Sequence, residues 1–173
     1  MIRPQMPELD FLSSTRNYQE LGAKVRRLVG DDAANSIQSQ ALYVGVRWIM
    51  LGGSHLREAR IARRAGLVRG CYSKAYYAAY NFSKGVRYLV KGQVSLKGDD
   101  HQSAPDFPDE FPDRDDMGKA LTDLYACRLQ ADYDNWGSAS RMFAIPTAEA
   151  LRLAGRVGAN ARAYVIGRRV RSR

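Results

Sequence analysis

Apolar residues recur every three or four positions along much of the chain, the spacing that places them on one face of an α-helix. The clearest stretch covers residues 68–90, and its stripe consists of Tyr72, Ala75, Tyr76, Ala79, Ser83, Val86 and Val90. Further helices are predicted over residues 37–65, from Asp115 to about Gly137, and from Thr147 onward. No segment shows the alternation expected of a half-buried strand. The pattern predicts an all-α fold, a four- to five-helix up-and-down bundle.

Glycines and capping residues divide this pattern. A weaker helix is predicted from about Ser13 to Val29, followed by a break at Gly30. The sequence Gly52-Gly53-Ser54 predicts either a kink or a division into two helices. Thr147 is expected to cap the last helix.

A long loop is predicted over residues 92–114, which hold two glycines and three prolines. Loops of this length inside a compact domain are uncommon. The expected organisation is an N-terminal extension over residues 1–36, one bundle domain over 37–168 and a basic tail over 169–173.

Charge is distributed unevenly along the chain. The 27 Lys and Arg residues outnumber the 18 Asp and Glu residues, which gives a net charge of +9. Residues 97–119 hold eight acids and three bases, so this segment carries −5 and the rest carries +14. Arginines gather in two runs: Arg57, Arg60, Arg63, Arg64 and Arg69, and then Arg152, Arg156, Arg162, Arg168, Arg169, Arg171 and Arg173. These runs indicate either an anionic partner such as RNA, DNA or a nucleotide, or a solvated basic surface.

The sequence also argues against several classes of protein. No segment approaches the roughly 18 uncharged apolar residues of a membrane span, and the first residues lack the apolar core of a secretory signal, so a cytoplasmic location is expected. Two cysteines and two histidines argue against a disulfide scaffold and a zinc site. No phosphate-binding glycine loop or standard hydrolase motif occurs. We expect no metal and no cofactor.

Arg128 is the most informative single residue. It lies on the same helical line as Leu121 and Leu124, so it points inward or into a groove. Either it pairs with Asp132 four residues on, or it binds phosphate. The tyrosines of residues 68–90 form a polar seam or a surface for stacking bases. His101 is a candidate general acid or base, or else a solvated or capping residue of the loop.

Three stretches resemble the HEPN superfamily (higher eukaryotes and prokaryotes nucleotide-binding). Residues 73–80, Ser-Lys-Ala-Tyr-Tyr-Ala-Ala-Tyr, are similar to the signature of its second core helix. Lys91-Gly92, His101 and Phe107 or Phe111 resemble the residues that mark its connecting loop. Residues 124–133 resemble the Leu-Tyr-x-x-Arg-x-x-Ala-Asp-Tyr motif of one bacterial and archaeal branch.

The resemblance implies a helical bundle that commonly forms a homodimer. Many members are metal-independent ribonucleases, acting as toxins in toxin–antitoxin pairs or in antiviral defence. Their site is an arginine and a histidine separated by four to six residues; the arginine binds the scissile phosphate and the histidine moves the proton of the 2′-hydroxyl. Arg128 matches the arginine, whereas Tyr133, Asp134 and Asn135 follow where histidine is expected.

Two hypotheses follow. The first is a nucleotide- or RNA-binding protein that uses Lys74, Tyr76, Tyr77 and Arg128 and works with a nucleotidyltransferase-like antitoxin or a defence complex. The second is a ribonuclease toxin in which Arg128 acts with His101, Tyr133 or Asp132. A homodimer is expected in both, because Trp48, Trp136 and Phe143 exceed what four helical stripes need.

Overall fold

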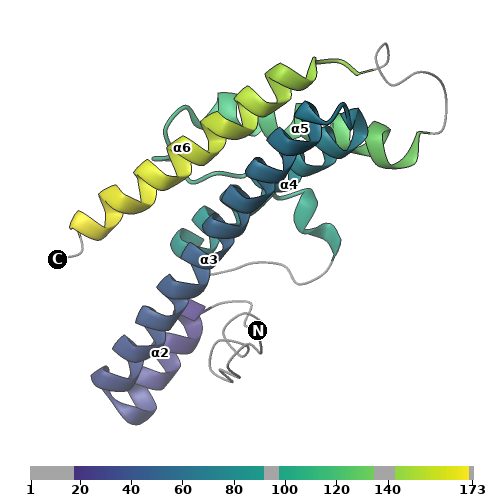
Figure 1. Cartoon of the computed structure of the whole chain (residues 1–173). Helices are drawn as coiled ribbons and strands as arrows, with labels where there is room; N and C mark the ends of the chain where they lie inside the picture. Colours follow the sequence, from purple (N-terminus) through teal and green to yellow (C-terminus); the bar gives the residue numbers. More distant parts are fainter. Residues whose placement is uncertain (1–17, 92–97, 135–142, 172–173) are drawn as a thin grey trace.

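The computed structural model describes residues 18–91, 98–134 and 143–171. Within these ranges the chain forms five α-helices, one 3-10 helix and no strand (Figure 1). The elements are α2 (Tyr18–Val29), α3 (Asp31–Arg64), α4 (Val68–Lys91), η1 (Gly98–His101), α5 (Arg114–Tyr133) and α6 (Thr147–Arg171). The predicted all-α class is confirmed. No helix in this part of the chain is long and apolar enough to cross a membrane.

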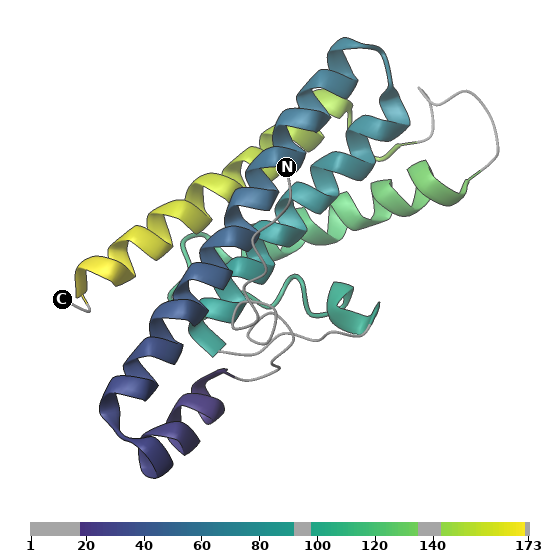
Figure 2. The same ribbon diagram turned by 60° about the horizontal axis from the view of Figure 1, so that its bottom comes forward.

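Helix α4 lies at the centre of the bundle, with α3, α5 and α6 each packed against it (Figures 1 and 2). Its predicted bounds of 68–90 agree with the observed ones to within one residue. A single apolar stripe does not describe it, however, because every residue from Asn81 to Tyr88 is buried. Lys84 and Arg87, which the pattern places off the stripe, are therefore inside the protein.

Helix α3 runs through 34 residues without interruption, so Gly52-Gly53-Ser54 does not divide it into two helices, and the alternative of a kink stays a prediction. Gly52 allows α3 to pack closely against α4. A Cβ atom at this position would lie 2.8 Å from Phe82 Cδ1 and 2.9 Å from the carbonyl oxygen of Ala78. The opposite side of the same ring meets Gly158 of α6, where a Cβ would lie 2.5 Å from Phe82 Cε2. Phe82 thus fits between two glycines on neighbouring helices.

The first half of α3 and α2 extend beyond the other helices (Figure 2). Only Gly30, with φ of 104°, separates the two helices, so α3 begins six residues before the expected start at residue 37. The expected boundary between residues 36 and 37 therefore falls inside a helix. Tyr18 ties α2 to the bundle, because its hydroxyl donates to the carbonyl of Leu89 at 3.0 Å and its ring packs on Tyr88. The predicted helix start near Ser13 lies outside the described residues.

The described part of the predicted long loop is packed rather than extended. After η1 the chain buries Ala104, Phe107 and Phe111, and the two phenylalanine rings stack at 4.2 Å. Asp113, in the left-handed region at φ 50°, precedes α5. The expected helix ends at Gly92 and Gly137 lie outside the described residues.

Two further expectations are corrected near α6. The helix already includes Thr147, and the Ala150 amide donates to the carbonyl of Pro146, so Pro146 rather than Thr147 is at the cap. Phe143 is not surplus, because it stacks on Tyr72 at 4.0 Å. Trp48 packs beside the small cluster around Tyr88. Trp136 lies outside the described residues, and the homodimer stays a prediction.

Candidate functional site

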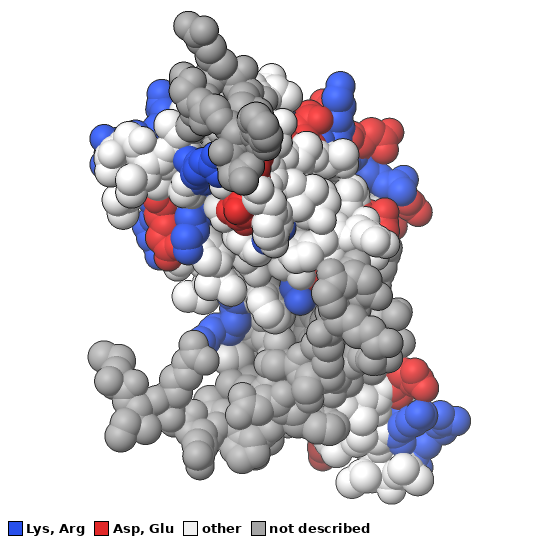
Figure 3. All heavy atoms as spheres, turned by 90° about the vertical axis from the view of Figure 1, so that its right-hand side faces the viewer, with Lys and Arg blue, Asp and Glu red and all other residues white. Residues whose placement is uncertain are grey.

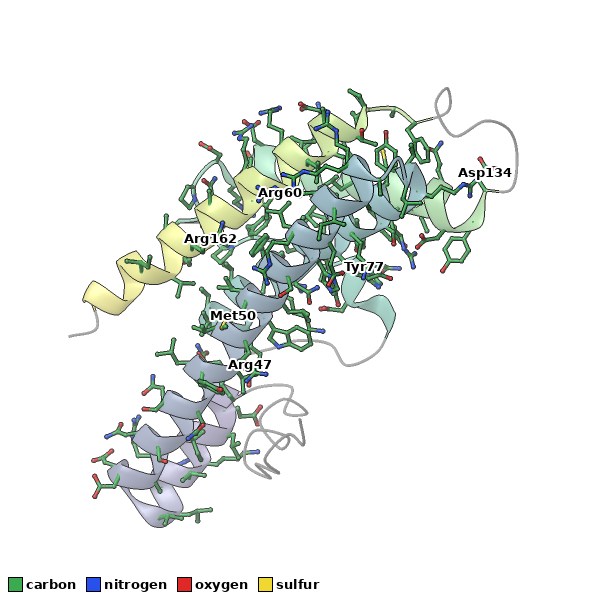
Figure 4. The ribbon with its side chains drawn as sticks, in the orientation of Figure 1. Arg47, Met50, Arg60, Tyr77, Asp134 and Arg162 are labelled. Carbon is green, nitrogen blue, oxygen red and sulfur yellow. The ribbon has the colours of Figure 1, made fainter. Side chains whose placement is uncertain are left out.

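A cluster of aromatic rings surrounds His101. Tyr76, Tyr77 and Tyr80 come from α4 and Tyr125 comes from α5; we call these four residues the tyrosine cluster. The His101 ring lies 4.6 Å from the Tyr80 ring and is nearly parallel to the Tyr125 ring at 5.9 Å. Figure 4 labels Tyr77 on the side of α4 that faces the segment containing η1. Tyr76 and Tyr77 precede Tyr80 by four and three residues, a spacing that places each of them beside Tyr80 on the helix surface.

Arg128 approaches the same cluster from α5. Its Nη2 donates to the hydroxyl of Tyr77 at 3.0 Å and to that of Tyr133 at 3.3 Å. Its Nε lies 2.7 Å from Asp132 Oδ2 but makes no well-aligned hydrogen bond. The side chain is 12% exposed, whereas Tyr133 is 70% exposed. Arg128 therefore lies at an edge between the interior and solvent, and the intrahelical pair with Asp132 is present as predicted.

The hydrogen bond between Tyr76 and His101 determines which imidazole nitrogen carries the proton. Tyr76 Oη lies 2.6 Å from His101 Nδ1, and this fully buried hydroxyl has no other partner among the described residues. Burial raises the pKa of Tyr76, so the phenol keeps its proton. The phenol donates that proton to Nδ1, because otherwise its hydrogen would be buried without an acceptor. The neutral imidazole therefore carries its own hydrogen on Nε2.

His101 is neutral near pH 7. Burial, and after it the positive charge of Arg128, lowers the pKa of His101 below its usual value of 6.5, although Asp100 acts in the opposite direction. The influence of Arg128 reflects how close the structure brings the two residues. They are 27 positions apart in sequence, and both contact the ring of Tyr77.

A buried ionic cluster fixes η1 to α4. Asp100 accepts hydrogen bonds from Tyr80 at 2.6 Å and Arg87 at 3.1 Å, and Lys84 Nζ lies 3.3 Å away. Burial alone would raise the pKa of Asp100, but the bond from Tyr80 and the two cations hold it below its usual value. Ser83 adds a bond to the carbonyl of Ala104 at 2.5 Å. The Asp100 cluster (Asp100, Lys84, Arg87 and Tyr80) thereby positions His101, the next residue along the chain.

The structure brings most of the predicted site residues together, with one correction. His101, Tyr77, Arg128, Asp132 and Tyr133 form one connected group. Tyr76 is fully buried, so it cannot contact a ligand as expected and acts on His101 instead. Lys74 Nζ is paired with Glu58 of α3 at 2.7 Å, and its role in ligand binding stays a prediction.

Sequence reasoning placed Tyr80 among the tyrosines of residues 68–90, but it missed Tyr125 and the charged residues Lys84, Arg87 and Asp100 as site residues. Two features of the sequence indicate the three charged residues. Lys84 and Arg87 lie three residues apart within residues 75–90 of the helix, whose other positions except Asn81 are apolar, aromatic or small, and Asp100 directly precedes the candidate histidine. Neither feature shows that Asp100 pairs with Lys84 and Arg87, because this pairing depends on how η1 packs against α4.

No group of three or more His, Cys, Asp or Glu side chains within the described ranges could hold a metal ion. Cys71 and Cys127 are buried free thiols, and burial raises the pKa of both. The geometry offers hydrogen-bond donors and aromatic faces in place of metal ligands.

Comparison with known proteins gave no match. No protein-family model matches the chain, and neither a curated protein nor a solved structure matches it. We therefore infer function from the residues and distances described above.

Proposed function

We propose that the protein is a HEPN-like nucleotide- or RNA-binding protein in which Arg128 binds phosphate. In line with the resemblance of its motifs, it works with a partner protein in a toxin–antitoxin or antiviral defence system. The observation that carries the proposal is the meeting of Arg128 and neutral His101 at the tyrosine cluster, on the edge of the bundle.

Arg128 has donor capacity left for a ligand. A guanidinium carries five N–H groups. Nη2 donates to Tyr77 and Tyr133, and Nε faces Asp132, whereas Nη1 donates to none of the described residues. Asp132 balances the positive charge, and the N–H groups of Nη1 remain able to donate. Such a group, already oriented by its neighbours, is suited to a phosphate oxygen.

The surroundings of Arg128 suit a nucleotide more than a free anion. The Nε2–H of His101 is a second donor, and the exposed ring of Tyr133 is a face on which a base can stack. On the side shown in Figure 3, Lys and Arg side chains lie scattered among Asp and Glu and form no continuous basic patch. Binding on this side would therefore depend on a few specific contacts.

The alternative function is metal-independent RNA cleavage, favoured by the proximity of His101 to Arg128. In that reaction a base removes the proton of a 2′-hydroxyl, the 2′-oxygen attacks phosphorus and the 5′-oxygen leaves with a proton. The product ends in a 2′,3′-cyclic phosphate. His101 can act as the base only if Nε2 lacks a hydrogen, and the bond from Tyr76 places a hydrogen there. Binding is therefore the primary proposal.

RNA binding tests the primary proposal. Fluorescence anisotropy with a labelled single-stranded RNA of mixed sequence would compare wild type, Arg128→Gln and Arg114→Gln. Arg114 lies on the same helix and pairs with Asp109 in a more exposed position, so it controls for the loss of one charge. Since a hydrogen bond to a charged group is worth about 1.5–3 kcal/mol, R128Q should weaken binding roughly 10- to 100-fold. It should also reduce the slope of log K against log salt by about 1.

Equal losses in R128Q and R114Q would show that binding is only a matter of net charge and would exclude the proposed site. The same RNAs, incubated in EDTA and analysed for 2′,3′-cyclic phosphate ends, test the alternative. Cleavage that disappears in both R128Q and His101→Gln would establish a ribonuclease in place of a binding protein.

A further inference from the structure

A second basic site lies away from Arg128, between the end of α3 and the start of α6. Here the surface forms a hollow of about 370 Å³. Its lining residues are Arg60, Arg63, Arg64, Ala148, Leu151 and Arg152. Figure 4 labels Arg60 beside α6. None of these residues belongs to the tyrosine cluster or to the Asp100 cluster.

The hollow has an excess of positive charge. Arg152 donates to Glu149 at 2.7 Å, so one arginine is balanced by one carboxylate. Arg60, Arg63 and Arg64 form no ion pair with any described residue. Glu58, the acid nearest to them in sequence, pairs instead with Lys74 of α4. Four arginines and one glutamate therefore leave about three positive charges around one hollow.

The N-terminus of α6 adds to this potential. Ala148 and Leu151 belong to the first turns of α6, whose free amides carry the positive end of the helix dipole. The sequence explains why the arginines converge. Arg60, Arg63 and Arg64 are spaced three and four residues apart near the end of α3, so they share one face of that helix, and α6 packs alongside it.

We propose that this hollow binds a terminal polyphosphate, either that of a nucleoside triphosphate or that of an RNA chain bearing a 5′-triphosphate. A phosphodiester within a chain carries one negative charge, which would leave most of the arginine charge unbalanced. A triphosphate group carries three or four negative charges and matches the excess. Arginine is the side chain best suited to it, because its planar fork pairs with two phosphate oxygens at once. The volume lies within the range of small-ligand sites.

The site goes beyond the proposed function, since it lies on different helices from Arg128 and requires no contribution from it. Isothermal titration with tripolyphosphate tests it directly. The test variant is Arg60→Gln combined with Arg64→Gln. The matched control is Arg47→Gln combined with Arg57→Gln, which removes two exposed arginines of the same helix that bond only to the neighbouring hydroxyls of Tyr43 and Ser54.

Wild type should bind one tripolyphosphate per chain. The R60Q/R64Q variant should bind it roughly 100-fold more weakly, about tenfold for each arginine, whereas the control should change by less than about threefold. R128Q should bind tripolyphosphate as wild type does, so failure of this proposal is distinguishable from failure of the first. Absence of saturable binding, or equal losses in the two double variants, would overturn the proposal. Circular dichroism melting of each variant verifies folding.

Two further ligands distinguish the sources of the polyphosphate. Competition by ATP, with no preference between RNAs that carry 5′-triphosphate and 5′-hydroxyl ends, assigns the hollow to a free nucleotide. Tighter binding of the 5′-triphosphate RNA, lost in R60Q/R64Q, assigns it to a chain end. If both RNAs bind equally and neither ATP nor tripolyphosphate competes, the hollow is a general backbone contact and the proposal is wrong.

Discussion

Arg87 and Arg128 are two arginines of one helical bundle with different surroundings. Arg87 is 4% exposed, donates to Asp100 and Ser83, and its Nη2 is buried without a partner. Arg128 is partly exposed and is held by two tyrosines and Asp132. The unused donor of Arg87 is inaccessible and only costs stability. Arg128 Nε is buried without a well-aligned partner as well, but Nη1 of this partly exposed side chain donates to none of the described residues. Burial, rather than residue type, separates the structural Arg87 from Arg128, the arginine that we propose to bind phosphate.

The largest expected effect concerns Asp100, the carboxylate that pairs with the buried Arg87. Asp100→Asn leaves Lys84 and Arg87 without their carboxylate in the interior, which should lower the free energy of unfolding by about 3–5 kcal/mol. Urea denaturation measures the loss. Asp109→Asn is the matched control, because the side chain of Asp109 is 87% exposed and its ion pair with Arg114 should be worth about 1 kcal/mol or less. A loss at D100N no greater than at D109N would contradict the structural role of the cluster.

The stability of the R128Q variant tests how much the partly exposed Arg128 contributes to the fold. Asp132 can be hydrated when the arginine is removed, since its side chain is 28% exposed. The free energy of unfolding should therefore fall by only about 1 kcal/mol, while RNA affinity falls far more. Paired urea denaturation and anisotropy measurements on one sample separate the two effects. A stability loss as large as that of D100N would place Arg128 among the structural residues.

The pH dependence of stability tests the state of His101. Its pKa in the folded protein lies below the usual 6.5, mainly because of burial and then because of Arg128. As pH falls through about 6.5, the unfolded chain binds this proton first, so the free energy of unfolding decreases. His101→Gln should remove that decrease between about pH 6.5 and the folded-state pKa. His55→Gln should retain it, and identical profiles for wild type and H101Q would show that His101 is not buried as described.

The smallest expected effect concerns the two hydroxyls that hold Arg128. Tyr133→Phe removes an exposed partner and should cost a few tenths of a kcal/mol, whereas Tyr77→Phe removes a half-buried one and should cost about 0.5–1.5 kcal/mol. Thermal denaturation of both variants gives the ranking. The reverse order would show that Tyr133 is the main support of the guanidinium.

The regular parts of the fold could be predicted from the sequence, and the irregular parts could not. Helical periodicity gave α4 to within one residue, because its apolar stripe reflects local geometry. From the sequence, Gly52 predicts a division of the helix, whereas in the structure it allows close contact with Phe82. The sequence alone does not distinguish these two roles of a glycine. Thr147 was assigned as a cap because capping residues are also tolerated one position inside a helix.

The candidate site divides in the same way. Arg128 and Asp132 lie four residues apart on one helix, so their pairing could be predicted from spacing alone. The position of His101 could not, because it depends on Asp100 reaching two cations of α4 more than ten residues earlier. Periodicity leaves Lys84 and Arg87 off the apolar stripe of α4, and it carries no information about the acid that meets them from η1.

The contact of Phe82 with Gly52 and Gly158 has a consequence for how this sequence can change over time. The ring fills the space that two missing side chains leave open, so the three positions are expected to vary together. A descendant with alanine at position 52 or 158 needs a smaller side chain at position 82, and a descendant that loses the ring first leaves a cavity between three helices. Substitutions that destabilise the protein singly should therefore be tolerated in combination. The spacing of α3, α4 and α6 is expected to change only when all three positions change together.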